Sequence, residues 1–196
     1  MKRRSPVWYF VAGQIVFYLG LLMCVVILPS GALMNDGISY YGIHVTTVIP
    51  YEIALVVGGS VAGILAARHV PNIGKMYRIR IGIYLFALLA LGVASTPYSI
   101  SDFFDNLHTG FGSLLFALQL FLTGWLALSY ARRWHLITLW AGELIAGLFS
   151  AYYIVVPVGY LFLSQIAFQI CFASIIIIIL QNIEFDKNQP AGTHKA

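Results

Sequence analysis

Residues 8–28 read WYFVAGQIVFYLGLLMCVVIL, an uncharged run of about 21 residues that follows the basic triplet Lys2-Arg3-Arg4. A helix of about 20 apolar residues is long enough to cross the hydrocarbon core of a bilayer. A basic start before an apolar run also imitates a signal peptide, but this run is long and Leu28-Pro29-Ser30-Gly31-Ala32 is a poor cleavage site. We therefore expect a retained first transmembrane helix.

Apolar windows of spanning length recur along the chain. The chain is 60% hydrophobic and 9% charged, whereas about 25% of the residues of an average soluble domain are charged. The windows cover residues 8–28, 48–67, 79–95, 107–130, 134–153 and 157–181, with Pro157 dividing the last two. We expect an all-α polytopic membrane bundle of six transmembrane helices as a single domain over 1–181, and a disordered polar tail over 182–196.

The basic residues predict the orientation of this bundle. All eleven lie at the termini or in the second and fourth connections, namely Lys2, Arg3, Arg4, Arg68, Lys75, Arg78, Arg80, Arg132, Arg133, Lys187 and Lys195. The first and third connections instead carry Asp36, Asp102 and Asp105. The positive-inside rule then places the N-terminus, the C-terminus and the tail in the cytoplasm of a multi-pass cell-membrane protein. Its net charge of +4 reflects topology, and we expect membrane lipids as partners, and no nucleic acid.

Two carboxyl groups fall inside predicted spans, where an ionisable side chain is costly and marks the first place to look for function. Glu143 lies near the middle of the fifth span and shares a helix face with Gly147. It is a candidate proton or ligand site, or alternatively an interhelical contact. Glu52 lies near the outer end of the second span, and its spacing to the packing motif Gly59-x-x-x-Gly63 predicts that it faces into the bundle.

Polar side chains also gather at the predicted outer end of the bundle. Tyr41 and His44 lie in the first connection, and His108 opens the fourth span. Gln119 lies on the same helix face as His108, so a polar stripe is expected to run from the outer mouth toward the membrane interior. The candidate ligand-binding residues are therefore Glu52, His108, Gln119, Glu143, Tyr41 and His44.

The donor types at this outer end also suit zinc, and a zinc-activated water could hydrolyse an amide or ester. His44, His108 and Asp102 are the candidate metal ligands, and His108, Glu52 and Asp105 are the candidate catalytic residues. No tight ligand spacing such as His-Glu-x-x-His supports this interpretation. No mid-helix histidine pair suits haem and no lysine lies within a span, so we expect no cofactor.

The remaining polar residues within the spans are glutamines. Gln14, Gln119, Gln165 and Gln169 are expected to join helices through hydrogen bonds worth about 1 kcal/mol each. Together with Glu143 they could alternatively line a narrow polar cavity. Cys24 and Cys171 are expected near opposite faces of the bilayer, so no disulfide is expected between them.

Two short stretches carry a family resemblance. The first is Gly37-Ile38-Ser39-Tyr40-Tyr41-Gly42, and the second is Thr96-Pro97-Tyr98 followed by Asp105-Asn106-Leu107-His108-Thr109. They resemble a large bacterial family of six-helix membrane proteins with a domain of unknown function, similar to the DRAM and FGF-receptor-activating membrane protein group. The resemblance implies a six-helix fold with a histidine of interest on the outer face, and no established activity.

Three hypotheses follow for function. The first is a non-enzymatic protein that binds a lipid or amphiphile in an outward-facing polar cavity, or that regulates other membrane proteins. The second is a small proton-coupled transporter using Glu143. The third is a metal-dependent membrane hydrolase at the outer face, built on His108, Glu52 and the aspartates.

Overall fold

The fold is given by a computed structural model, which describes residues 5–30, 37–98, 100–130, 133–156 and 159–188. These residues form helices and no strand, and six of the helices are long and apolar enough to cross a membrane. The short 3-10 helix is η1, Ile38–Gly42. The six spanning helices are α1, Pro6–Ile27; the continuous α3–η2–α4, Val48–His69; α5, Gly74–Ala94; α6, Asp102–Ser129; α7, Trp134–Val155; and α8, Leu161–Asn188.

The number and type of the spanning helices are confirmed, but three of their ends are corrected. Helices α5 and α6 begin at Gly74 and Asp102 rather than at 79 and 107. Helix α8 continues through 182–188, which were expected to be disordered. Hydropathy windows detect only the part of a helix that matches hydrocarbon, whereas a helix can continue into the polar boundary. The first turn of α6, for example, is capped by the hydroxyl of Ser101, which accepts from the Phe104 amide at 3.5 Å.

Some predicted features lie outside the described residues. They are Lys2, Arg3, Arg4, Asp36, Arg132, Pro157, Lys195 and the tail from 189 to 196.

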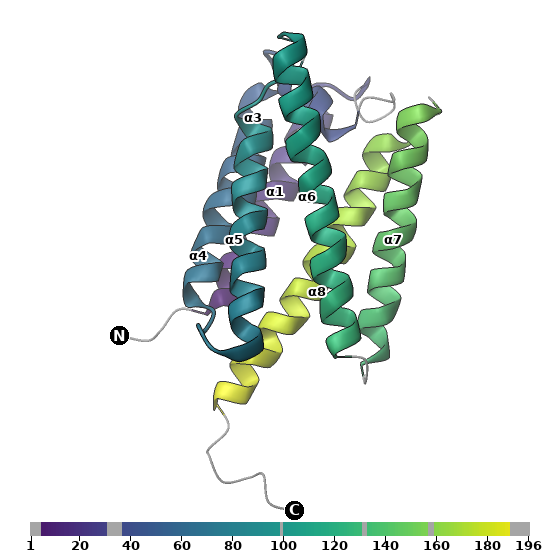
Figure 1. The fold of residues 1–196 in the computed structure, drawn as a ribbon. Coiled ribbons are helices and arrows are strands. Elements are labelled where there is room, and N and C mark those ends of the chain that lie inside the picture. Colours follow the sequence, from purple (N-terminus) through teal and green to yellow (C-terminus); the bar gives the residue numbers. More distant parts are fainter. Residues whose placement is uncertain (1–4, 31–36, 99, 131–132, 157–158, 189–196) are drawn as a thin grey trace, which may run out of the picture.

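The helices form two groups joined by α6 (Figure 1). Helices α1 and α5 each pack against the second span, α3–η2–α4, and α7 and α8 form an antiparallel hairpin. Helix α6 contacts α5 on one side and α7 and α8 on the other, while α8 also reaches α1. The interior that these contacts enclose is therefore shared by helices from both groups.

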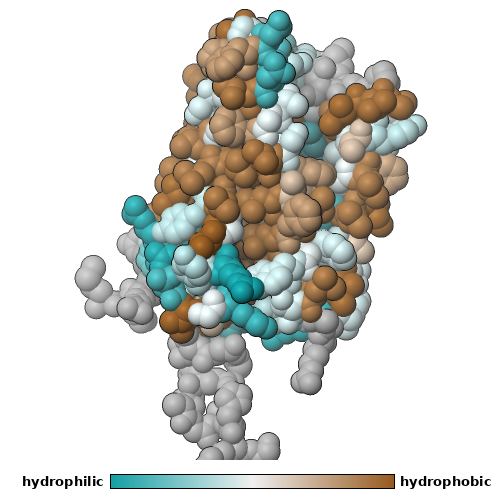
Figure 2. Space-filling model, viewed as in Figure 1, coloured by the Kyte–Doolittle hydropathy of each residue, from teal (hydrophilic) through white to brown (hydrophobic). Residues whose placement is uncertain are grey.

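The two ends of the bundle differ in charge. Helix α1 begins and α8 ends at the same end (Figure 1), where Arg68, Lys75, Arg78 and Arg133 also lie. We call this the basic end. The opposite end carries η1, the α5–α6 connection and the start of α8, and we call it the η1 end. Between them the surface is largely apolar in the view of Figure 2, as expected for helices that face lipid.

Close backbone contact fastens α1 to the second span. A Cβ atom on Gly13 would lie 2.4 Å from Ala62 Cβ and 2.6 Å from the carbonyl oxygen of Gly58. Helix α1 contacts both α4 and the π-helix η2, Ile53–Val61. Within η2 the Ser60 hydroxyl donates to the Leu55 carbonyl at 3.3 Å. The motif Gly59-x-x-x-Gly63 packs against another helix, as predicted, and that helix is α5, because its glycines face Ala90 and Ala87.

Candidate functional site

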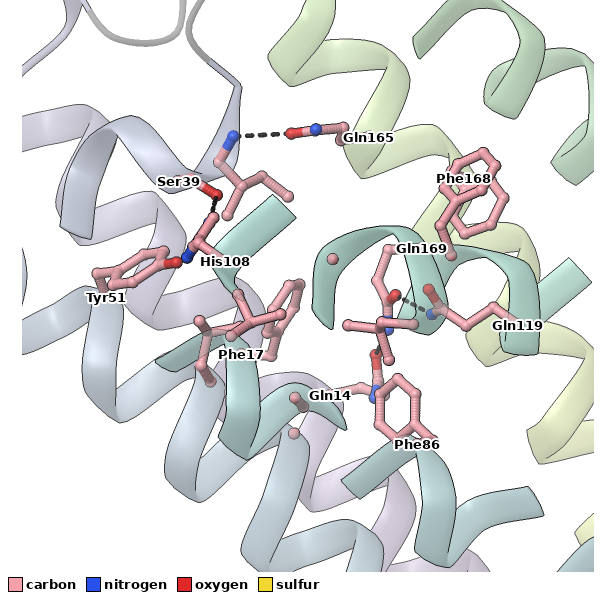
Figure 3. A pocket seen from close by; sticks show the side chains of 18 residues that line it. Gln14, Phe17, Ser39, Tyr51, Phe86, His108, Gln119, Gln165, Phe168 and Gln169 are labelled. Atoms are coloured by element: carbon pink, nitrogen blue, oxygen red, sulfur yellow. Dashed lines mark hydrogen bonds between the residues drawn. The ribbon is translucent and has the colours of Figure 1, made fainter. Parts of the chain in front are cut away.

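A cavity of about 160 Å³ lies within the helices, and we call it the central cavity (Figure 3). Its walls are mainly apolar, and its polar side chains divide into two groups. The apolar side chains include Phe17, Leu55, Phe86, Val93, Leu115, Phe116 and Phe168. The polar ones are Gln14, Ser39, Tyr51, His108, Gln119, Gln165 and Gln169.

His108 and Ser39 form a hydrogen-bonded pair toward the η1 end of the cavity. The Nε2 atom of His108 lies 2.8 Å from Ser39 Oγ, and its Nδ1 atom lies 2.6 Å from the carbonyl oxygen of Thr96. A carbonyl only accepts, so Nδ1 carries the proton and a neutral ring presents its Nε2 lone pair to the serine hydroxyl. Both side chains are half-buried. In this neutral tautomer the Ser39 hydroxyl is the donor and His108 Nε2 is the acceptor.

The end of α5 explains why the Thr96 carbonyl is available to His108. Thr96 precedes Pro97, and the residue before a proline is disfavoured in helical conformation, so the helix ends here. The Thr96 hydroxyl donates to the Gly92 carbonyl at 2.7 Å and holds the last turn. Its own carbonyl therefore leaves the helical ladder and accepts from the histidine.

Gln165 positions the segment that carries Ser39. Its Oε1 accepts from the Ile38 amide at 2.7 Å, which leaves the amide nitrogen of Gln165 as a donor beside the cavity. Gly37 makes this approach possible, because a Cβ there would lie 2.7 Å from Gln165 Oε1 and the residue has a φ of +65°. The phenol of Tyr51 also lies against Ser39 (Figure 3).

Three glutamines from three helices form the second polar group. Gln119 Nε2 donates to Gln169 Oε1 at 2.6 Å, and Gln169 Nε2 donates to Gln14 Oε1 at 3.3 Å. The prediction that these glutamines join helices is confirmed. They also line the central cavity, so the same glutamines both join helices and line a polar cavity, the two roles that the sequence left open.

The predicted polar stripe on α6 is also confirmed. His108, Gly112 and Gln119 all line the central cavity. The stripe therefore connects the Ser39–His108 pair with the glutamine group.

Other predicted ligand-binding residues lie elsewhere. Tyr41 and His44 do not line the cavity. Tyr41 is fully buried in an apolar cluster, and this burial, with smaller effects from Cys24 and Tyr40, raises the pKa of its phenol to about 12. His44 packs edge-on against the Tyr40 ring at 4.2 Å. Both side chains therefore have packing roles in this structure.

Glu52 is half-buried and does not line the cavity, while its neighbour Tyr51 does. The prediction assumed a regular α-helix, in which offsets of seven residues return to one face. The π-helix that begins at Ile53 has a wider turn, and it aligns Tyr51, Leu55 and Gly59 along the cavity instead.

Glu143 is fully buried in the fifth span and does not line the cavity. The side chain of Thr123 on α6 lies beside this carboxyl group, but neither carboxyl oxygen makes a hydrogen bond of ordinary geometry among the described residues. The indole nitrogen of Trp140, one turn away on α7, is also buried without a partner there. A buried carboxyl in this setting is expected to be protonated, because an unpaired charge in hydrocarbon is costly.

The candidate metal ligands do not come together. Among the described residues, no group of three His, Cys, Asp or Glu side chains could hold a metal ion. Both ring nitrogens of His108 already have hydrogen-bond partners, and Asp102 and Asp105 lie in the first turn of α6. Cys24 and Cys171 are free thiols, as predicted. The donors for the hypothesised zinc hydrolase, His108, Glu52 and Asp105, are therefore not assembled as a metal site.

Sequence reasoning did not identify Ser39 or Tyr51 as site residues, whereas Gln165 was among the glutamines expected either to join helices or to line a cavity. Ser39 belongs to one of the two stretches that carried the family resemblance, and that was its only signal. Comparisons with protein-family models, curated proteins and solved structures find no match for this chain. The resemblance to the DRAM and FGF-receptor-activating group therefore stays a prediction.

Proposed function

We propose that this protein is a multi-pass membrane protein that binds a lipid or small amphiphile in the central cavity. The observation that carries the proposal is the cavity itself, which has aromatic and aliphatic walls and two separate polar groups. Ligand sites are typically apolar clefts with a few placed polar groups that fix orientation.

The cavity matches one part of an amphiphile. Its volume of about 160 Å³ is close to that of an engineered cavity of ~150 Å³ that binds benzene. Phe17, Phe86 and Phe116 suit a short acyl or ring-shaped portion, while Ser39 and His108 offer hydrogen bonds to a polar group. A ligand with an apolar portion and a polar group can therefore contact the aromatic walls and the Ser39–His108 pair at once.

We also propose that the basic end faces the cytoplasm of a cell membrane and that the η1 end faces outward. Lys75 and Arg133 lie at the basic end, whereas Asp102 opens α6 at the η1 end, in accord with the positive-inside rule. Single cysteines at positions 102 and 133, in a background with Cys24 and Cys171 replaced by Ala, should react with an impermeant maleimide from opposite sides of intact cells. Labelling of both positions from one side would refute this orientation.

Two glycines of α6 provide a matched test of binding. Gly112 lines the cavity and Gly110 does not, and a Cβ atom on either would meet nothing within 4 Å. We expect Gly112→Leu to fill the cavity and Gly110→Leu to leave it open. The probe is a medium-chain fatty alcohol that bears a diazirine, crosslinked to the nanodisc-embedded protein and mapped by peptide mass spectrometry.

The expected result is labelling of cavity-lining peptides that falls at least fivefold in Gly112→Leu and is retained in Gly110→Leu. Thermal unfolding of each variant reports whether the fold is intact. Equal labelling of the native protein and both variants would show that the probe reacts only with the lipid-facing surface, which would refute the proposal.

A second candidate function, proton-coupled transport, is favoured by the fully buried carboxyl of Glu143 in the fifth span. Glu143→Gln keeps the shape and the neutral state while removing the exchangeable proton. In proteoliposomes with an internal pH dye and an imposed potassium diffusion potential, a transporter of this kind should carry a proton flux that Glu143→Gln abolishes. Equal flux in the native and variant proteins would exclude this role for Glu143.

A further inference from the structure

We propose that Ser39 and His108 are a nucleophile and general base that cleave a carboxylic ester of an amphiphile bound in the central cavity. This inference rests on the binding function proposed above and adds a reaction to it. Its basis is the 2.8 Å contact between Ser39 Oγ and His108 Nε2 in the cavity wall, with His108 Nδ1 held by the Thr96 carbonyl at 2.6 Å.

The three groups have the arrangement that activates a serine. A serine hydroxyl is a weak nucleophile until a neighbouring base takes its proton. The base must present a free lone pair, and a third group must hold it in that tautomer. Here the Thr96 carbonyl takes the role that a carboxylate often has, because it accepts the Nδ1 proton and directs Nε2 to Ser39.

The reaction balances without a metal or redox partner. Ser39 Oγ attacks the ester carbonyl carbon while its proton moves to His108 Nε2. The carbon–oxygen bond to the alcohol then breaks, the alcohol oxygen takes the proton from Nε2, and the acyl group remains on Ser39. Water attacks this acyl ester with His108 again as the base, which releases the carboxylic acid and restores the Ser39 hydroxyl.

Two donors that line the same cavity as Ser39 can stabilise the negative oxygen that forms during attack. The amide nitrogen of Gln165 is available because its oxygen accepts from the Ile38 amide. The Tyr51 hydroxyl lies against Ser39 in the same part of the cavity (Figure 3). Hydrogen-bond donors placed where charge develops are a large source of rate enhancement in acyl transfer.

The cavity also limits the substrate. The apolar walls begin beside the pair and occupy only about 160 Å³. A short acyl chain or a single ring therefore fits while the rest of the amphiphile extends out of the cavity. The substrate class is an ester whose cleaved bond lies at the boundary between its apolar and polar parts.

A fluorophosphonate tests this inference on the full-length protein in nanodiscs. An activated serine displaces fluoride from the phosphorus and keeps a stable covalent label. We expect one label, mapped by peptide mass spectrometry to Ser39 of the unaltered protein. Ser39→Ala should remove it, while Ser174→Ala, whose hydroxyl bonds only within α8, should retain it.

His108→Gln tests the base separately from the nucleophile. General-base assistance is worth about 10²–10⁴-fold in rate, so the labelling rate should fall at least about 100-fold in this variant. Ser39→Ala and His108→Gln should both lose the release of nitrophenol from p-nitrophenyl butyrate. Absence of a label on Ser39 in the unaltered protein would overturn the inference without any variant having to fold.

The two proposals fail in different ways. The diazirine alcohol carries no ester, so its crosslinking reports binding alone. Crosslinking that persists in Ser39→Ala, together with an unlabelled Ser39 in the unaltered protein, would leave the binding function and refute the reaction. Labelling of Ser39 without any cavity crosslinking would refute the binding assignment instead.

Discussion

Gly37→Ala is expected both to destabilise the protein and to displace the adjoining residues Ile38 and Ser39. Gly37 has φ 65° and ψ −167°, a region occupied essentially only by glycine, and strain of this kind costs about 1–3 kcal/mol. The added Cβ would lie 2.7 Å from Gln165 Oε1, so Gln165 must move and release the Ile38 amide. Loss of that hydrogen bond costs a further ~0.5–1.5 kcal/mol, for a total of about 2–4 kcal/mol.

Gly74→Ala is the matched control within the same chain. Gly74 also has a positive φ, +51°, but a Cβ there would meet nothing within 4 Å. It should therefore show only the backbone cost, about 1–2 kcal/mol. Thermal unfolding in one detergent compares the two variants, and a further ~1 kcal/mol corresponds to about 2–4 °C for a chain of this size.

A double-mutant cycle separates the clash from the backbone strain. Gln165→Ala removes the side chain that the new Cβ would strike. The cost of Gly37→Ala should therefore be smaller in the Gln165→Ala background than in the native protein. A Gly37→Ala variant that is no less stable than Gly74→Ala, or costs that are simply additive in the cycle, would refute the reasoning about this contact.

Two further predictions concern packing inside the bundle. Gly13→Ala should lower the free energy of unfolding by about 1–3 kcal/mol through overpacking, because its Cβ would lie 2.4 Å from that of Ala62. Gly110→Ala is the control, because a Cβ there meets open space. It should be neutral or stabilise α6 by up to ~1 kcal/mol. Equal unfolding temperatures for these two variants would contradict the close α1 contact. Gln169→Leu should cost about 1–2 kcal/mol by breaking both glutamine bonds, whereas exposed Gln181→Leu should change stability by less than ~0.5 kcal/mol. Unfolding scans that rank Gln181→Leu as the more damaging would show that the glutamine group does not stabilise the bundle.

The spans were predictable because a bilayer imposes a length. About 20 apolar residues are needed per helix whatever the tertiary contacts are, so the windows and the spacing of basic residues were sufficient. The helix ends were not, because Lys75 and Arg78 are polar yet helical. Arg78 lies over the Trp125 ring at 5.9 Å, and a contact of this kind between helices has no signal in a hydropathy window.

The face of a helix was predictable only where the helix is regular. The α6 stripe from His108 to Gln119 follows the 3.6-residue period and lies where expected. The second span contains a π-helical segment, Ile53–Val61. The 3.6-residue period therefore predicted that Glu52 faces the interior, whereas Tyr51 is the residue that lines the cavity. The sequence period gives no signal for a π-helix, and this one lies where Gly13 closely approaches Gly58.

The Ser39–His108 pair shows how local rules and distant contacts combine. Proline at 97 ends α5 and frees the Thr96 carbonyl, and glycine at 37 admits the Gln165 amide, so both supports have a local cause in the sequence. The bond between Ser39 and His108 joins residues 69 positions apart, and only the packing of α6 against the η1 segment brings them together. If the pair were only a structural bond, Ser39→Ala would affect stability alone. A loss of fluorophosphonate labelling in His108→Gln, in which Ser39 is still present, is the result that a purely structural bond would not produce.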